Sequence, residues 1–281
     1  MIVLQYIING ILLGGVYAVL GVGMTMIFGI VKLTNLAHGE FVIIGAYAST
    51  LIAGAIGVDP ILTLIVTIPL MFLIGWGLQS GLINRVMLKG SEPALLVTFG
   101  LSIILQDALL LLFSADARRA SAGAYSTVVF HIGSISIALL DIILLVIGLL
   151  TIGILTWFLN KTYLGRSIRA TSDDTQAASL MGVSVKKTYG IAMGIAMATA
   201  AVAGLCIALK WTYYPSSGGS YLLTAFGVVV IGGMGSIPGT LVAGLVFGLA
   251  QVIGGANYGL LISYVLMIIM LAVRPQGLFS K

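Results

Sequence analysis

Residues 137–159 read IALLDIILLVIGLLTIGILTWFL, and Asp141 is the only charged residue among them. A helix needs about 20 consecutive apolar residues to cross the hydrocarbon core of a bilayer, and this run supplies them. Its apolar residues are continuous and do not alternate with polar ones, which favours a helix over a strand of a membrane barrel. The stretch therefore predicts a transmembrane helix.

Similar apolar runs occupy most of the remaining chain. They cover residues 3–30, 41–57, 60–82, 93–113, 188–210, 222–237, 238–256 and 259–273. The run 222–237 is short and rich in glycine, so it is either a full crossing or a re-entrant half. The runs predict an all-α transmembrane bundle of eight or nine spans with broken or re-entrant segments, forming a single domain over 1–281. Because no basic segment precedes the first run, we expect it to be a retained helix and not a cleaved signal.

Composition supports a membrane protein. Of the 281 residues 60% are hydrophobic and 7% are charged, whereas a soluble domain carries about 25% charged residues. The net charge is +5, but the bases are confined to short loops, so the positive-inside rule explains them better than a nucleic-acid partner does. The single cysteine, Cys206, lies in an apolar run and is expected to be a small buried side chain.

The basic residues also predict the orientation. Loops 84–92 and 160–187 and the C-terminus hold nine of them, whereas the loop 114–134 holds only Arg118 and Arg119. The basic loops should be cytoplasmic and the N-terminus outside. This arrangement requires the run 222–237 to cross the membrane.

Glycine pairs at four-residue spacing predict close helix packing, because small residues let helix backbones approach in lipid. The pairs are Gly10/Gly14, Gly77/Gly81, Gly190/Gly194 and Gly244/Gly248.

Two interruptions of the apolar pattern are candidates for the solute path. The segment 32–40 places Asn35, His38 and Glu40 beside the bilayer, either in a broken helix that lines the path or in a polar loop at the cytoplasmic surface. The second, at 232–239, is either part of the path or a tight turn outside the membrane. Its candidate residues are Gly232, Gly233, Gly235, Ser236 and Pro238. We expect the two interruptions to approach each other or a partner permease.

Enzymatic chemistry has no visible basis in the sequence. There is no Gly-Lys dipeptide and hence no phosphate-binding Walker loop, and His38 and His131 do not have a metal-binding spacing. Asp107, inside the run 93–113, is expected to be a buried structural partner or else a proton carrier. Asp141 and Lys210 should lie at the membrane interface, with Lys210 extending toward the headgroups. We therefore expect no catalytic residue, no metal site and no cofactor in this chain.

The loop 165–182 is expected to hold a short amphipathic helix along the cytoplasmic face. Ser172 or Asp173 can cap it, Asp174 suits its positive end, and Gly182 can end it. Its apolar side suggests that it docks onto a partner, and the small Ala177 and Ala178 would let that partner approach closely. A solvated connector, the other interpretation, would not need these apolar residues.

The residues Gln176-Ala-Ala-Ser-Leu-Met-Gly182 resemble the Glu-Ala-Ala-x-x-x-Gly loop of binding-protein-dependent ABC permeases, with Gln176 in place of the Glu. In that family the loop is the coupling helix that contacts the ATPase. The resemblance places a cytoplasmic coupling loop at about 160–187. Its candidate coupling residues are Arg166, Arg169, Asp173, Asp174, Gln176, Ala177, Ala178 and Gly182.

The remaining motifs are similar to LivH-type permeases of branched-chain amino acid ABC importers. They are Asn35-Leu-Ala-His-Gly-Glu-Phe41, Gly165-Arg-Ser-Ile-Arg-Ala170, 232–239 and Arg274-Pro-Gln-Gly-Leu-Phe279. The resemblance implies a multi-pass subunit of a bacterial inner membrane, a second homologous permease, two ATPase subunits that bind ATP and magnesium, and an extracytoplasmic substrate-binding protein. It implies branched-chain or other hydrophobic amino acids as substrate. Relatives with this architecture carry urea, short amides or aromatic acids, and these are the alternative substrates. An ion-coupled secondary transporter, with Glu40, Asp107 or Asp141 as ion sites, is a more distant alternative.

Overall fold

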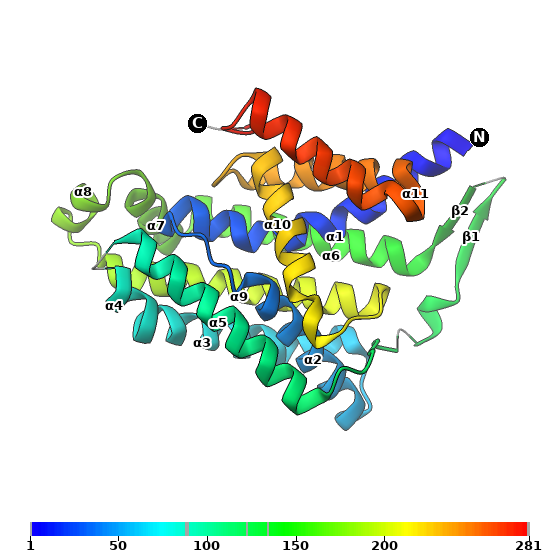
Figure 1. Cartoon of the computed structure of the whole chain (residues 1–281), viewed down its shortest axis with the longest axis horizontal. Coiled ribbons are helices and arrows are strands. Elements are labelled where there is room, and N and C mark those ends of the chain that lie inside the picture. Colours follow the sequence, from blue (N-terminus) through cyan, green and yellow to red (C-terminus); the bar gives the residue numbers. More distant parts are fainter. Residues whose placement is uncertain (1, 88–89, 122, 134, 280–281) are drawn as a thin grey trace.

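The computed structural model describes residues 2–87, 90–121, 123–133 and 135–279, and most of them are helical (Figure 1). The α-helices are α1 (Ile2–Val31), α2 (His38–Ile56), α3 (Leu64–Leu78), α4 (Asn84–Met87), α5 (Ser91–Phe113), α6 (Leu139–Lys161), α7 (Tyr163–Asp173), α8 (Thr175–Leu180), α9 (Val185–Lys210), α10 (Gly218–Gly232) and α11 (Ile237–Val273). The short turns are the 3-10 helices η1 (Pro60–Thr63), η3 (Gly123–Ser126) and η4 (Pro215–Ser217) and the π-helix η2 (Gln79–Ile83). Eight helical segments of the described chain are long and apolar enough to cross a membrane, which confirms the predicted all-α bundle.

The last of these segments is bent into a hairpin. Gly255 has a φ of 64° in the middle of α11, where the helix breaks. Beyond the break the chain folds back on itself, because Ser263 Oγ lies 3.3 Å from Phe247 O, sixteen residues earlier. The predicted runs 238–256 and 259–273 are therefore the two antiparallel arms of one element.

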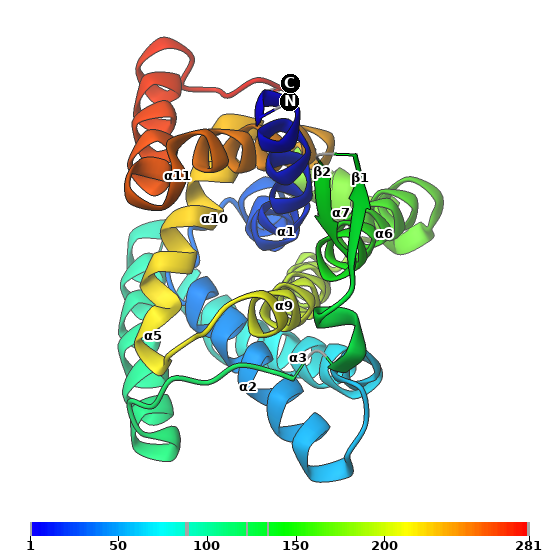
Figure 2. The same ribbon diagram turned by 90° about the vertical axis from the view of Figure 1, so that its right-hand side faces the viewer.

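α1 and α9 form the centre of the bundle, and the other helices surround them (Figure 2). α9 is rich in alanine and glycine, and its residues from Ala196 to Leu209 are almost all buried. Small side chains allow close approach: a Cβ added to Gly45 of α2 would lie 2.8 Å from the Cα of Ala201. Cys206 is fully buried in this helix, as predicted.

The glycine pairs confirm the packing prediction at three of the four places. Gly10 and Gly14 of α1 meet α11, where a Cβ added to Gly248 would lie 2.5 Å from Gly10 O. Gly190 and Gly194 pack against Trp76 and Phe72 of α3. The prediction is wrong for Gly77 and Gly81 within the described part of the chain, where a Cβ at either position would meet nothing within 4 Å. Spacing alone does not reveal which face of a helix meets a neighbour.

The predicted cytoplasmic loops lie at one end of the molecule, where Figure 1 shows α4, α7 and α8. Asn84 Nδ2 donates to Lys186 O at 3.2 Å, which joins the loop after α3 to the start of α9. Ser172 of α7 donates to Gly29 O at the end of α1. The C-terminal tail joins the same end, where the Leu278 amide donates to Ile231 O at 2.9 Å.

α10 completes this arrangement. It lies steeply across α1 (Figure 1). Before it, Tyr213 forms a β-bridge with Arg118 of the outer loop. After it comes the inner turn at Gly233. The segment from Tyr213 to Gly233 therefore connects the outer loop with the inner turn, as the predicted orientation requires.

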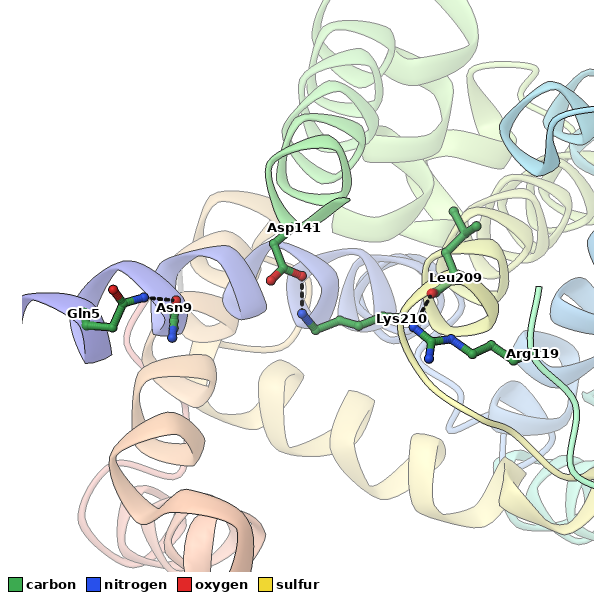
Figure 3. Close-up of polar contacts among 6 residues, drawn as sticks. All are labelled: Gln5, Asn9, Arg119, Asp141, Leu209 and Lys210. Atoms are coloured by element: carbon green, nitrogen blue, oxygen red, sulfur yellow. Dashed lines mark hydrogen bonds and ion pairs between the residues drawn. The ribbon is translucent and has the colours of Figure 1, made fainter. Parts of the chain in front are cut away.

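The opposite end carries a feature that the apolar runs do not reveal, an antiparallel hairpin of β1 (Val129–Ile132) and β2 (Ile135–Ala138). Gln5 at the start of α1 holds it, accepting from Ser136 N at 2.9 Å. Nearby, Lys210 of α9 forms an ion pair with Asp141 of α6 (Figure 3). The sequence did not predict this ion pair, and the interfacial position expected for both residues stays a prediction.

Candidate functional site

The helix α2 starts inside the bundle and not at its surface. His38, its first residue, has Nε2 at 3.3 Å from Leu20 O of α1. Leu20 lies eleven residues before the end of α1 at Val31, which is roughly 16 Å along a helix axis at 1.5 Å per residue. The chain between α1 and α2 therefore runs back into the bundle without helical structure.

This non-helical segment, residues 32–37, has support for its backbone. Asn35 Oδ1 accepts from the Ala37 amide at 3.1 Å, and the Leu36 amide donates to Thr98 Oγ1 of α5 at 3.3 Å. Irregular backbone at membrane depth is tolerated where it is buried in protein or lines a cavity. The segment is thus a broken helix start, and the alternative of a polar loop at the surface does not describe it.

The three polar candidates of this segment lie within the protein. The exposed fractions of Asn35, His38 and Glu40 are 0%, 1% and 2%. Each has a side-chain atom without a hydrogen-bond partner among the described residues: Asn35 Nδ2, His38 Nδ1 and Glu40 Oε2. Buried polar atoms are nearly always satisfied in folded proteins. Three unsatisfied atoms within six residues therefore make this segment the candidate site.

Glu40 lies between the N-termini of two helices. It is in the first turn of α2, and it faces Gly218, the first residue of α10. A Cβ added to Gly218 would overlap the Glu40 carboxyl group, and one added to Gly39 would overlap Gly218 O. Helix N-termini carry partial positive charge, so both ends favour the charged form of the Glu40 carboxyl group, whereas its burial disfavours that form.

Three residues of this site were not predicted from the sequence. Thr98 and Ser102 come from α5, where Ser102 faces the Glu40 carboxyl group. Gly218 comes from a serine- and glycine-rich stretch before α10 that resembles an ordinary turn. A hydroxyl residue on an apolar helix is a weak signal, because serine and threonine also bond to their own helix backbone.

The second interruption, 232–239, is a tight turn at the cytoplasmic end. Gly233 and Gly235 have φ values of 97° and 87°, and a Cβ added to Gly29 of α1 would lie 2.6 Å from the Cα of Gly235. Ser236 Oγ caps α11 by accepting from the Gly239 amide at 3.1 Å, and Pro238 lies in the first turn. The interruption packs on the end of α1, whereas the Asn35–Glu40 segment packs further inside. Turn geometry accounts for these residues, and a role in the solute path stays a prediction for them.

The predicted coupling loop forms two helices, α7 and α8. Asp174 separates them and caps α8, accepting from the amides of Gln176 and Ala177 at 2.8 and 2.9 Å. The cap is thus Asp174 and neither Ser172 nor Asp173, because α7 continues through those two positions. Gly182 has a φ of 85°, which favours glycine where the helix ends.

Several side chains of this loop are available to a partner. Arg166, Arg169, Asp173, Gln176 and Ala177 are exposed. Ala178 is only 5% exposed and packs against its own chain, so the expectation that both alanines face a partner is wrong for Ala178. Leu180 and Met181 are 88% and 85% exposed, and they form the apolar tip of α8.

Asp107 also differs from the expectation. Its side chain is exposed on α5 and is not buried against another helix of this chain. Ionisable residues within membrane spans face protein or water and avoid lipid. The Asp107 face of α5 is therefore unsuited to contact with lipid tails.

A central broken helix with unsatisfied polar groups, inside a bundle of apolar spans, defines the chain as a multi-pass membrane protein with the features of a transport pathway. A family model described as "Branched-chain amino acid transport system / permease component" matches residues 6–271. The chain therefore belongs to this family of permease components, which confirms the resemblance of its motifs.

Individual relatives agree with the family. The chain is 32% identical to the high-affinity branched-chain amino acid transport system permease protein LivH of Escherichia coli K12, over 99% of this chain and 96% of the relative. It is 30% identical to the permease protein BraD of Pseudomonas aeruginosa over the same shares. The ribose import permease protein RbsC of Haemophilus influenzae is 25% identical over 95% of this chain and 83% of its own length. No solved structure matches the chain.

Proposed function

We propose that the chain is one of two permease subunits of an ABC importer that brings branched-chain or other hydrophobic amino acids across a bacterial inner membrane. The family match over 6–271 is the observation that carries the proposal. Relatives named as branched-chain amino acid permeases over nearly their whole length support the substrate class.

A second, homologous permease is the proposed neighbour of α5. The exposed Asp107 supports this assignment, since a carboxyl group within a span needs a protein or water surface beside it. Thr98 and Ser102 of the same helix contact the Asn35–Glu40 segment. The proposed solute path therefore runs beside α5, between this segment and the second permease.

Two cytoplasmic ATPase subunits, which bind ATP and magnesium, are the proposed source of energy. The exposed apolar tip of α8 supports a protein contact at the end that holds the basic loops. A soluble binding protein on the opposite side is the proposed donor of substrate.

Reconstitution tests this function. The chain, its second permease and the ATPases are placed in liposomes, and the binding protein is added outside with labelled leucine, urea, a short amide or an aromatic acid. We expect ATP-dependent uptake of leucine that persists when proton and sodium gradients are collapsed. The chain by itself should neither hydrolyse ATP nor concentrate substrate. Uptake that requires an ion gradient and no ATP would identify a secondary transporter, and selective uptake of urea, an amide or an aromatic acid would correct the substrate class.

A further inference from the structure

A basic pocket lies at the cytoplasmic end, away from the Asn35–Glu40 segment. Its volume is about 370 Å³, and it is lined by Trp76, Ser80, Asn84, Arg85, Lys186 and Lys187. One wall comes from the end of α3, from η2 and from α4, and the other comes from the first turn of α9. No acidic residue is among those that line it.

Specific contacts hold the two walls together. Asn84 Nδ2 donates to Lys186 O at 3.2 Å, and Gln79 Nε2 donates to Asn84 Oδ1 at 3.0 Å. Gly190 of α9 brings the backbone close to Trp76 and Ser80, since a Cβ there would lie 3.0 Å from both. The π-helical turn η2 forms one side, and such turns are frequent at functional sites.

The cations of the pocket have no paired acidic side chain among the residues that the structure describes. Arg85, Lys186 and Lys187 are exposed, and none of them forms an ion pair within the described residues. Lys186 and Lys187 also lie in the first turn of α9, where the partial positive charge of the helix end opposes them. A bound anion would neutralise both the side chains and the helix end.

The surroundings indicate where that anion comes from. Val66, Leu70, Leu73 and Trp76 repeat at helical spacing along α3, and their exposed fractions are between 44% and 61%. This apolar face leads directly to the pocket. Basic pockets between membrane helices on the cytoplasmic side bind anionic headgroups, and tryptophan is enriched at the level of the headgroups.

We propose that this pocket binds the phosphate headgroup of an anionic phospholipid from the inner leaflet, with the acyl chains along the exposed face of α3. Arg85, Lys186 and Lys187 hold the phosphate, and Ser80 and Asn84 supply additional polar contacts. The chemistry that it recognises is a phosphodiester monoanion in a headgroup that carries no ammonium group to neutralise it. The apolar face assigns it to a lipid in preference to free phosphate.

Trp76 reports occupancy, because it is one of three tryptophans and Trp157 and Trp211 can be changed to Phe. In this background, brominated-tail phosphatidylglycerol should quench Trp76 at lower mole fraction than brominated-tail phosphatidylcholine. The preference should fall by about fivefold for each cation removed in Arg85→Gln, Lys186→Gln and Lys187→Gln. The matched control changes Lys161, Arg166 and Arg169 to Gln, which removes the same charge from the same end.

Three outcomes would overturn the proposal. Equal quenching by the two lipids, or an equal loss of preference in the control, would mean that only general attraction acts here. A second experiment, in detergent, tests inorganic phosphate as the ligand. If phosphate shifts the Trp76 emission saturably and phosphatidylglycerol does not compete with it, the pocket is a soluble-anion site. Elution as a single peak in size-exclusion chromatography confirms that each variant is folded.

Discussion

Glu40 illustrates how one side chain connects separate parts of this molecule. Its carboxylate lies in the first turn of α2 and against the first residue of α10, and Oε2 has no partner in the chain. It therefore has electrostatic support and also a free acceptor position. This combination suits a group that contacts a passing solute.

Replacing Glu40 with Gln keeps the size of the side chain and removes its charge. We expect uptake by the assembled importer to fall by about tenfold, since the interaction of a charge with a buried helix end is worth up to about 2 kcal/mol. Glu92→Gln, an exposed acid on α5, is the control and should leave uptake unchanged. Uptake of labelled substrate, normalised to membrane expression, measures the effect. If Glu40→Gln transports as well as the parent, the carboxylate has no role in the path.

Gly218 and Gly219 allow a test of the close contact between α2 and α10. A Cβ at Gly218 would overlap the Glu40 carboxyl group, whereas a Cβ at Gly219 would meet nothing within 4 Å. Gly218→Ala should therefore destabilise the protein by about 1–3 kcal/mol, as overpacking does, and Gly219→Ala should not. Apparent melting temperatures in detergent compare the two variants. Equal melting temperatures would show that the first residues of α2 and α10 can move apart without loss of stability.

At the scale of elements, the broken start of α2 and the helix pair α7–α8 are the two features that most distinguish this bundle. The residues 32–37 give up helical hydrogen bonds so that α2 can start at depth, and Thr98 of α5 restores part of them. The α7–α8 pair is anchored by Ser172 on the last turns of α1. A force on α8 would therefore reach α1, on which both the broken segment and the 232–239 turn pack.

Leu180 and Met181 should carry the contact with the ATPase. Changing both to Ser removes apolar surface that is exposed in this chain, so the chain itself should remain as stable as the parent. We expect loss of uptake and of substrate-stimulated ATP hydrolysis in the complex, because the partner would lose an apolar anchor. Met234→Ser, an exposed methionine in the 232–239 turn, is the matched control. If the double variant hydrolyses ATP and transports normally, α8 is only a connector.

At the scale of the whole molecule, the arrangement of charge predicts the topology. The ends of α4 and α7, the start of α9 and the C-terminal tail share one end, and the β1–β2 hairpin lies at the other (Figure 1). Positive loops remain on the cytoplasmic side of the membrane. A fluorescent protein fused after the C-terminus should therefore fluoresce, and alkaline phosphatase inserted at Gly133 should be active. The reverse pattern of activities would invert the orientation.

Much of this architecture was predictable because a bilayer imposes simple rules on a chain. The length of apolar runs located the spans, and the basic loops located one end. The positions of Asn35, His38 and Glu40 between two runs marked them as candidates. Thr98, Ser102 and Gly218 were not predictable, because nothing in their local sequence says which helix they face.

The sequence by itself determined the membrane class, the apolar runs of the spans and the family, since these depend on composition, run length and motifs, whereas the orientation stays a prediction. The tertiary structure decided how the spans are used. It showed that α2 starts at depth, that Gly77 and Gly81 face open space while Gly10 and Gly14 meet α11, and that Asp107 points away from the bundle. The physical reason is that lipid requires each span to be apolar and helical. Every span meets this requirement in nearly the same way, so the requirement does not specify which spans contact each other. Which faces meet depends on contacts between residues far apart in the chain, and those contacts exist only in the folded protein.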